Sequence, residues 1–146
     1  MDYLLDSNVF LRLADKKSPH HKTVLAAISK LRAGNNVLCY TPQVLAEFWN
    51  VCTRPATERG GLGFSTGNAS RKADVIMKHF RLLPDSMATF SEWRRLVSDH
   101  KISGVQVHDA KIVASMIVHG IQTLITFNEK DFKRFPMITV INPEDA

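Results

Sequence analysis

The chain has 146 residues, of which 45% are hydrophobic, so it suits one compact domain over residues 1–146 and leaves no room for a second. A formal net charge of +5, from 19 basic and 14 acidic side chains, suits a partner that carries phosphates. No stretch approaches the roughly 18 apolar residues of a membrane span, and the acidic start differs from a signal peptide. The 2 cysteines lack the spacing of a metal site or a redox pair. These features predict a cytoplasmic protein without membrane contact.

The chain opens with a short apolar strand that leads directly into a carboxylate and a helix. Residues 3–5 are apolar, which predicts a central parallel strand buried on both faces. Asp6 follows at the carboxyl end of this strand, and Ser7 and Asn8 are available to cap the next helix. Ligands bind at this edge in open α/β sheets, so Asp6 is a candidate site residue. A role for Asp6 as a turn or capping residue alone is the alternative.

Strand and helix patterns then alternate along the chain. Ser18 and Pro19 predict the start of a helix that ends near Gly34, with Leu25 among its inward side chains. Residues 37–40 form a second short apolar run, followed by a helix from Pro42 to about Thr53. This succession predicts a parallel sheet with helical crossovers.

The helix that starts at Pro42 carries a second carboxylate. Glu47 lies at the border of the apolar arc that includes Val44, Phe48 and Val51, so it points along the edge of the core. A purely structural glutamate is the alternative, because Glu is a good helix former.

Residues 54–68 form the one long stretch without periodicity, and loops of this length within a compact domain are usually functional or disordered. Its glycines do not match a phosphate-binding loop, because no Gly-Lys-Ser/Thr follows. Arg54 and Arg59 are candidates for contacts with a nucleic-acid backbone, and a plain mobile connection is the alternative. Further on we expect a helix from about residue 66, a strand near 80–84 and a helix over 86–100 with Phe90 turned inward.

The third carboxylate lies in a helical stretch over residues 105–120. A helical wheel places His108, Lys111, Ser115 and His119 on a narrow polar face and Asp109 on the opposite, apolar side. A carboxylate in that position is costly unless a cation, a metal or hydrogen-bond donors compensate it. The alternative is that Asp109 is the N-cap of a helix that begins one turn later.

The last third of the chain predicts two more strands, at residues 122–126 and 138–141. The first of them delivers Thr126 and the polar residues after it to the same sheet edge as Asp6. We therefore expect Asp6, Glu47 and Asp109 to converge within reach of one metal ion.

Together these motifs resemble the PIN-domain nucleases, in particular the VapC-type toxins of VapBC toxin–antitoxin pairs. The resemblance covers essentially the whole chain and rests on Leu4-Leu5-Asp6-Ser7-Asn8, Val44-Leu45-Ala46-Glu47, His108-Asp109-Ala110-Lys111 and Thr126-Phe127-Asn128-Glu129-Lys130-Asp131-Phe132. It implies a Rossmann-like three-layer α/β/α sandwich with a central parallel sheet. It also implies an endoribonuclease that hydrolyses RNA phosphodiester bonds with Mg²⁺ or Mn²⁺, and partners that are an RNA substrate, a cognate antitoxin and a second copy in a homodimer.

Carried over residue by residue, Asp6, Glu47 and Asp109 match the catalytic, metal-binding acids of the family. Many members have a further acid where this chain has Asn128, so Asn128 is the expected fourth metal ligand and Asp131 is the alternative. This departure leaves the number of metal ions open. The polar residues expected to support the acids are Ser7, Asn8 and Thr126. The basic residues expected to bind RNA are Arg12, Arg54, Arg59 and Lys130.

Two other classes stay open at this point. A phosphatase of the haloacid-dehalogenase type also places an aspartate after its first strand, but it requires a second aspartate where this chain has Asn8. A noncatalytic RNA- or protein-binding module on a PIN-like fold would have lost its acids, whereas three of the four are retained here.

Overall fold

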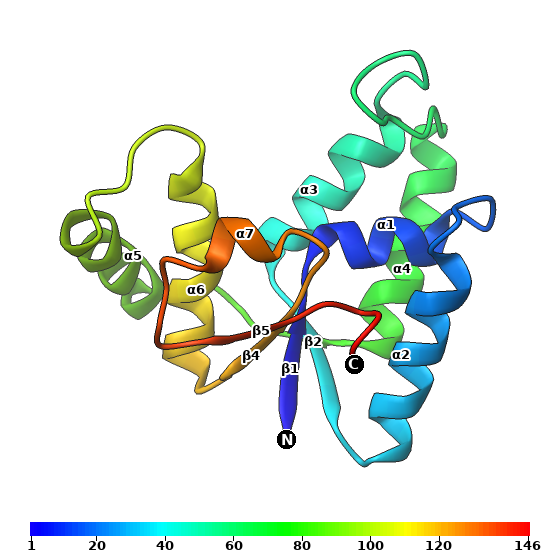
Figure 1. The fold of residues 1–146 in the computed structure, drawn as a ribbon. Coiled ribbons are helices and arrows are strands. Elements are labelled where there is room, and N and C mark those ends of the chain that lie inside the picture. The colour runs from blue at the N-terminus through cyan, green and yellow to red at the C-terminus, as the bar shows by residue number, and fades with distance from the viewer.

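Five parallel strands form the central sheet of the computed structural model, which describes residues 1–146 (Figure 1). The strands follow the order β3-β2-β1-β4-β5 across the sheet. Their bounds are Asp2–Leu5 for β1, Val37–Tyr40 for β2, Arg81–Leu82 for β3, Thr123–Ile125 for β4 and Thr139–Ile141 for β5. Every neighbouring pair is parallel, so the predicted parallel sheet is confirmed.

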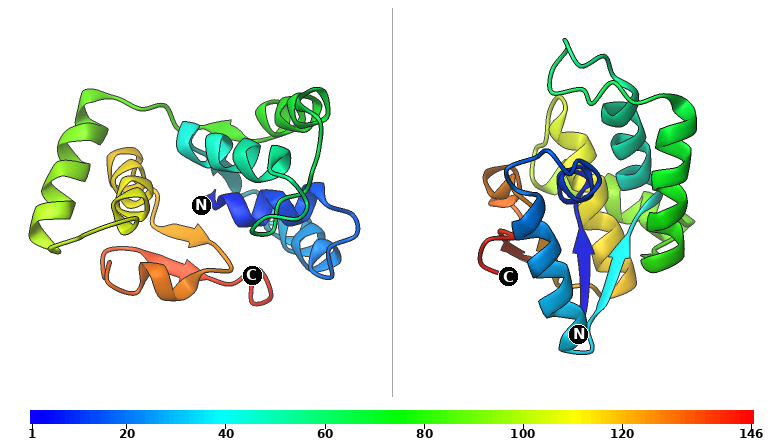
Figure 2. Two further views of the ribbon diagram at one scale, coloured as in Figure 1. Left: turned by 90° about the horizontal axis from the view of Figure 1, so that it is seen from above. Right: turned by 90° about the vertical axis from the view of Figure 1, so that its right-hand side faces the viewer.

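Helices cover this sheet in two layers. They are α1 (Ser7–Ala14), α2 (His21–Ala33), α3 (Pro42–Thr53), α4 (Thr66–His79), α5 (Met87–Asp99), α6 (Gln106–His119) and α7 (Glu129–Phe132). Viewed from above, α1 to α4 lie on one side of the sheet and α5 and α6 on the other (Figure 2). The chain moves outward from β1 to β3 and then crosses back to β4, and right-handed crossovers in opposite directions place helices on opposite faces. The predicted three-layer α/β/α sandwich is confirmed.

β1 lies where the direction of the crossovers reverses, with β2 on one side and β4 on the other. Leu4 and Leu5 in this strand are 0% and 1% exposed, as expected for a strand with helices on both faces. Asp6 follows directly, and its backbone N–H donates to the carbonyl of Ile125 at 3.0 Å. Ligands of open α/β sheets bind at the carboxyl ends of strands beside such a reversal, so the fold places Asp6 at the preferred position.

α2 begins later than predicted, and one of its apolar side chains faces solvent. The Ser18 hydroxyl accepts a hydrogen bond from the His20 backbone N–H, which closes a turn before the helix starts at His21. Leu25 is 48% exposed, whereas Ile28 is buried. The apolar stripe of α2 is therefore narrower than its sequence pattern predicts.

The helix α6 packs against α5, and two side chains that the helical wheel placed on its polar face are buried or contact the protein. Ser115 is 1% exposed, and the His119 ring Nε2 lies 2.9 Å from the carbonyl oxygen of Pro84. The N-cap of α6 is Val105, so Asp109 lies within the first turn. The alternative that made Asp109 a capping residue is wrong.

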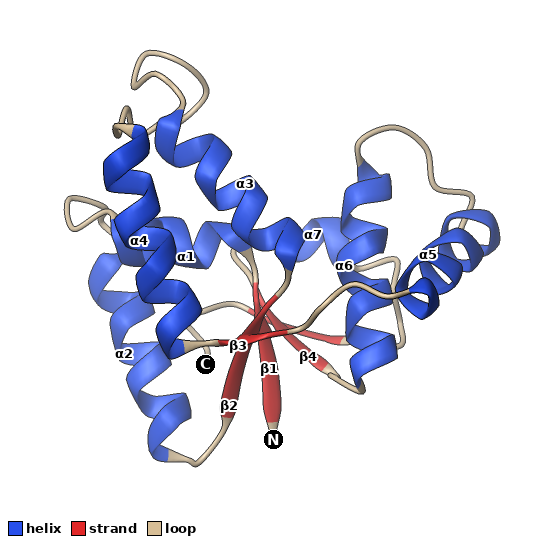
Figure 3. Ribbon diagram, turned by 180° about the vertical axis from the view of Figure 1, so that it is seen from behind, coloured by secondary structure: helices blue, strands red, loops and turns tan.

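The long loop between α3 and α4 projects beyond both helices and folds back on the end of α3 (Figure 3). The Leu62 backbone N–H donates to the carbonyl of Val51 at 3.0 Å. Gly61 passes so close to the preceding turn that a Cβ at this position would lie 2.3 Å from the carbonyl oxygen of Pro55. The backbone path of this loop therefore depends on its hydrogen bonds and on a residue without a side chain.

Candidate active site

Asp6 is held at the end of β1 by buried hydrogen bonds. Its Oδ1 accepts the backbone N–H of Ser7 at 2.7 Å, which makes Asp6 the N-cap of α1. Its Oδ2 accepts the Thr126 hydroxyl at 2.8 Å and the Asn8 Nδ2 at 3.3 Å. Burial raises the pKa of Asp6, the donors Thr126 and Ser7 lower it, and the nearby charge of Glu47 raises it further. Asp6 therefore caps α1, as one interpretation predicted, and also faces a second carboxylate.

Asn8 uses both ends of its amide to support this arrangement. Its Nδ2 donates to the Thr126 hydroxyl at 3.0 Å, and its Oδ1 accepts the backbone N–H of Phe127 at 3.2 Å. An ionised aspartate has no donor to give to Asp6 or Thr126, so the network requires an amide at position 8. This use of Asn8 differs from the catalytic second aspartate of a haloacid-dehalogenase site.

Replacing Thr126 by valine should destabilise the protein by about 1–3 kcal/mol, because Asp6 stays buried while its Oδ2 loses its closest donor. Valine keeps the branched shape of threonine. The free energy of unfolding in urea measures the effect, and Thr139→Val in the exposed part of β5 is the control. Equal stability of the two variants would show that the hydroxyl does not support Asp6.

Glu47 reaches the same edge from α3 and is held through both of its oxygens. Its Oε2 accepts the Ser7 hydroxyl at 3.1 Å, and its Oε1 accepts the Gln43 Nε2 at 2.9 Å. Ser7 thus contacts Asp6 through its backbone and Glu47 through its side chain. Gln43 was not predicted as a site residue, because its only sequence signal is a position one helical turn before Glu47.

Asp109 lies in the first turn of α6 without a compensating partner. Burial raises its pKa to about 7, with the charges of Asp131, Asp6 and Glu47 adding to the effect and no hydrogen bond opposing it. None of the four ion pairs in the structure involves these acids. Four acidic side chains from different parts of the chain are therefore close enough for the charges of three of them to raise the pKa of the fourth, Asp109.

Asp131 and Asn128 differ in how they relate to this cluster. Among the three neighbouring charges, that of Asp131 raises the pKa of Asp109 most, and α7, which carries Asp131, packs against α6. Asp131 and Asn128 are both exposed, and the backbone N–H of Asn128 donates to the Thr126 hydroxyl at 3.0 Å. Asp131 is therefore the fourth acid of this cluster, and the uncharged Asn128 remains a candidate ligand through its amide oxygen.

The acids suit a divalent cation by their chemistry but do not form a ready-made ligand set. As the side chains stand, no three carboxylates, imidazoles or thiols come close enough together to hold a metal ion, so the expected convergence on one point is not met. Asp6 and Glu47 are fixed by their donors, and Asp109 is uncompensated. An acidic set with oxygen ligands alone and no basic side chain paired to it fits Mg²⁺ or Mn²⁺, which prefer oxygen ligands.

The basic residues predicted to bind RNA have different surroundings. Arg12 is half-buried, with its Nη1 donating to the carbonyl of Asn8 at 3.0 Å and its guanidinium 4.5 Å from the centre of the Phe127 ring. Arg54 donates to the carbonyl of Arg59 at 2.8 Å and so supports the long loop. Of the four basic residues predicted to bind RNA, Arg59 and Lys130 are exposed.

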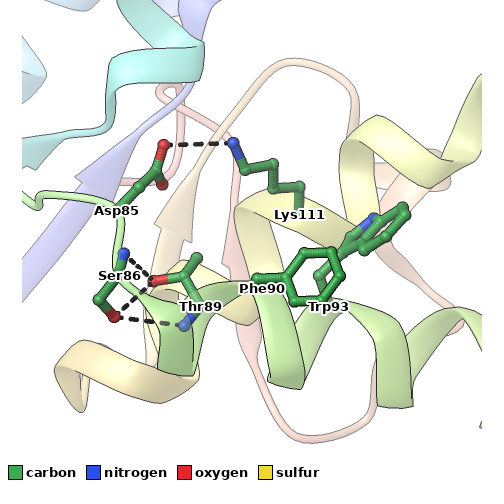
Figure 4. A pocket seen from close by; sticks show the side chains of 6 residues that line it. All are labelled: Asp85, Ser86, Thr89, Phe90, Trp93 and Lys111. Carbon is green, nitrogen blue, oxygen red and sulfur yellow. Dashed lines mark hydrogen bonds and ion pairs between the residues drawn. The ribbon is translucent and has the colours of Figure 1, made fainter.

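A separate hollow of about 250 Å³ lies between α5 and α6 (Figure 4). It is lined by Asp85, Ser86, Thr89, Phe90, Trp93 and Lys111. Its only carboxylate, Asp85, is paired with Lys111 at 3.2 Å, so the hollow has no uncompensated acid. Phe90 was predicted to face the core, but it is 56% exposed because it lies on the rim of this hollow.

The fold and the acids together define an α/β protein with an acidic site at the carboxyl edge of its sheet. The sequence matches the PIN domain family over residues 3–137. The chain therefore belongs to the PIN domain family, as its motifs predicted.

Similar proteins agree with this assignment. Ribonuclease VapC48 of Mycobacterium tuberculosis is 24% identical over 143 residues, which cover 98% of each chain. Among solved structures, VapBC2 from Rickettsia felis bound to a promoter DNA fragment gives a TM-score of 0.73 at 23% identity, with 97% of this chain and 98% of that chain covered. VapBC-1 from nontypeable Haemophilus influenzae gives 0.71 at 18% identity, with 98% of both chains covered. These structures share the fold of this chain.

Proposed function

We propose that this protein is a divalent-metal-dependent endoribonuclease and the toxin of a toxin–antitoxin pair. The observation that carries the proposal is the cluster of Asp6, Glu47, Asp109 and Asp131 at the carboxyl edge of the sheet, in which no acid forms an ion pair and Asp109 has no hydrogen-bond donor. Membership of the PIN domain family and the likeness to Ribonuclease VapC48 support the choice of RNA as substrate.

The acidic residues of this chain have different roles in such a site. Asp6 and Glu47 are the ligands that are held in place. Thr126 and Ser7 donate hydrogen bonds to Asp6, and Ser7 and Gln43 donate to Glu47. Asp109 is the ligand without other partners, so it is free to turn towards a cation. When bound, Mg²⁺ or Mn²⁺ lowers the pKa of water and offsets the charge of the scissile phosphate. The metal ligands we propose are Asp6, Glu47, Asp109 and Asp131, with Asn128 as the alternative to Asp131.

The proposed partners follow from the solved relatives. VapBC2 and VapBC-1 resemble this chain over nearly its whole length, which supports a cognate antitoxin that holds the nuclease inactive. No helix combines the length and the apolar character needed to cross a membrane. The two cysteines are buried and unpaired, which suits action on RNA in the reducing cytoplasm. The homodimer predicted from the family resemblance stays a prediction, and light scattering tests it.

The test is RNA cleavage by the purified, antitoxin-free chain after chelation of metal. We expect no cleavage in EDTA, cleavage after addition of Mg²⁺ or Mn²⁺, and products with a 5′-phosphate and a 3′-hydroxyl. The variant Asp6→Asn, prepared in the same way, controls for contaminating nucleases. Cleavage that survives EDTA, or products with a 2′,3′-cyclic phosphate, would contradict the proposal.

RNA binding should depend steeply on salt, because an acidic site repels RNA and affinity has to come from a basic rim. Replacing Arg59 and Lys130 together by alanine should reduce the slope of log affinity against log salt by roughly 1.4, at about 0.7 for each lost contact with a single strand. Fluorescence anisotropy with the metal-free protein measures this slope.

The matched control removes the same charge from α5. Arg95 pairs there with Asp99 at 3.0 Å and with Glu92, and Arg94 bonds Ser98. Arg94→Ala combined with Arg95→Ala should leave the slope unchanged. If the two double variants behave alike, Arg59 and Lys130 are ordinary surface residues.

A further inference from the structure

Gln43 connects the two helices that carry Glu47 and Asp109. Its Nε2 donates to Glu47 Oε1 at 2.9 Å within α3 and to the backbone carbonyl of His108 at 2.8 Å in α6. The bond to His108 is the only hydrogen bond between α3 and α6. Because His108 directly precedes Asp109, one amide links a side-chain carboxylate to the backbone beside another.

The acceptors fix the orientation of this amide. With Nε2 directed at Glu47 and at the His108 carbonyl, both of its hydrogens are used. The reverse orientation would place Oε1 against two oxygens. In the observed orientation Oε1 is buried without a partner, which is costly for a polar atom. The Gln43 side chain therefore makes two hydrogen bonds as a donor and leaves its oxygen without a partner.

No other residue joins these two parts of the site. Ser7 connects Glu47 to Asp6, and Thr126 connects Asp6 to the segment that follows β4, but no hydrogen bond reaches the carboxylate of Asp109. α3 and α6 also belong to opposite layers of the sandwich (Figure 2). The separation of Glu47 from Asp109 is thus set by the packing of two layers and by Gln43.

We propose that Gln43 is a positioning residue that fixes the separation of Glu47 and Asp109 and thereby sets the affinity for the divalent cation. The inference rests on the proposed metal-dependent function. Groups that orient metal ligands from outside the ligand set typically change metal affinity by about 10–100-fold. In this role Gln43 acts through its bonds to Glu47 and to the α6 backbone.

The test replaces Gln43 by methionine, which keeps the length of the side chain and its preference for helices but removes both donors. The matched control is Gln106→Met, because Gln106 is also a half-buried glutamine in the first turn of a helix and makes no side-chain hydrogen bond. The free-Mn²⁺ signal in electron paramagnetic resonance gives the dissociation constant of each variant. Melting temperatures without metal report on folding.

We expect Gln43→Met to weaken Mn²⁺ binding by about 10-fold or more, with a melting temperature close to that of the wild type, and Gln106→Met to bind as the wild type does. At saturating Mn²⁺ the cleavage rate of Gln43→Met should recover. In a Glu47→Ala background, Gln43→Met should cost little further affinity, because it acts through Glu47.

Two results would overturn this inference, and they are distinguishable. If Gln43→Met binds Mn²⁺ as tightly as the wild type, with or without a loss of melting temperature, the metal-dependent function stands and Gln43 only packs α3 against α6. If the wild-type chain itself binds no Mn²⁺, the proposed function fails and the positioning role fails with it.

Discussion

Substituting Asp109 by asparagine should abolish RNA cleavage and, at the same time, stabilise the metal-free protein. Loss of a metal ligand should lower the cleavage rate by at least about 100-fold, since even changes outside the ligand set cost about 10–100-fold. The stabilising effect follows because asparagine keeps the size of the side chain and removes a half-buried charge that Asp131, Asp6 and Glu47 repel.

The pKa of Asp109 determines at which pH Asp109→Asn should stabilise the protein. The pKa of Asp109 is about 7 in the folded protein against 3.8 as its ordinary value, so the folded state binds the extra proton between these values. Stability from this group is therefore fully present below about pH 4 and is lost as the pH rises to about 7. At pH 8, after a discount for the partial exposure of the group, Asp109→Asn should be more stable by about 1–2 kcal/mol, or roughly 2–8 °C in Tm.

The control for this prediction is Asp99→Asn, the same chemical change at an exposed residue that pairs with Arg95 at 3.0 Å. It should neither raise the Tm at pH 8 nor lower the cleavage rate. Thermal melts without metal at several pH values between 4 and 8 make the comparison. An Asp109→Asn variant that melts below the wild type at pH 8 would contradict the assignment of an uncompensated charge.

Addition of Mn²⁺ to the metal-free protein should raise its Tm, because a ligand that binds only the folded state stabilises that state. At 100 times the dissociation constant the gain is about 2.7 kcal/mol, which corresponds to roughly 5–10 °C for a chain of this size. The gain should be larger at pH 8 than at pH 6, because below about pH 7 the cation has to displace the proton of Asp109.

Differential scanning fluorimetry with and without MnCl₂ measures this shift, with NaCl at equal ionic strength as the control for screening. Asp109→Asn should show little of the shift. A wild-type Tm that does not respond to Mn²⁺, or an equal response in Asp109→Asn, would place the cation elsewhere on the protein.

Local sequence signals predicted the framework of this site because each signal acts over a few residues. The apolar run before Asp6 encodes a buried strand, and the polar residues after it encode a helix start, so β1 and α1 follow directly. Glu47 was placed at the border of the core by helical spacing, and it is half-buried. The positions of these residues could be predicted without knowing which distant segments pack against them.

The features that the sequence did not predict depend on contacts between distant segments. A helical wheel cannot show that Ser115 is buried or that His119 contacts the Pro84 carbonyl, so both were placed on a polar face. Gln43 escaped notice because one of its acceptors is a backbone carbonyl 65 positions away in the chain. Arg12 was predicted to bind RNA, and its sequence position does not show that its guanidinium lies over the Phe127 ring.

The relation between Asp131 and Asn128 was also beyond the sequence. The motif resemblance pointed to Asn128, whereas the charge of Asp131, in the short helix α7, also raises the pKa of Asp109. Side-chain orientation after a strand depends on where the next helix packs, and here α7 packs against α6 and β5. A spacing rule therefore cannot decide between two polar residues three positions apart.

Anomalous scattering from crystals grown with Mn²⁺ tests most directly whether the acidic cluster is a metal site. A peak within coordination distance of Asp6, Glu47 and Asp109 is the predicted result, and its position relative to Asp131 and Asn128 identifies the fourth ligand. A Mn²⁺ peak elsewhere on the protein, with these carboxylates left without a cation at saturating Mn²⁺ and pH 8, would contradict the account.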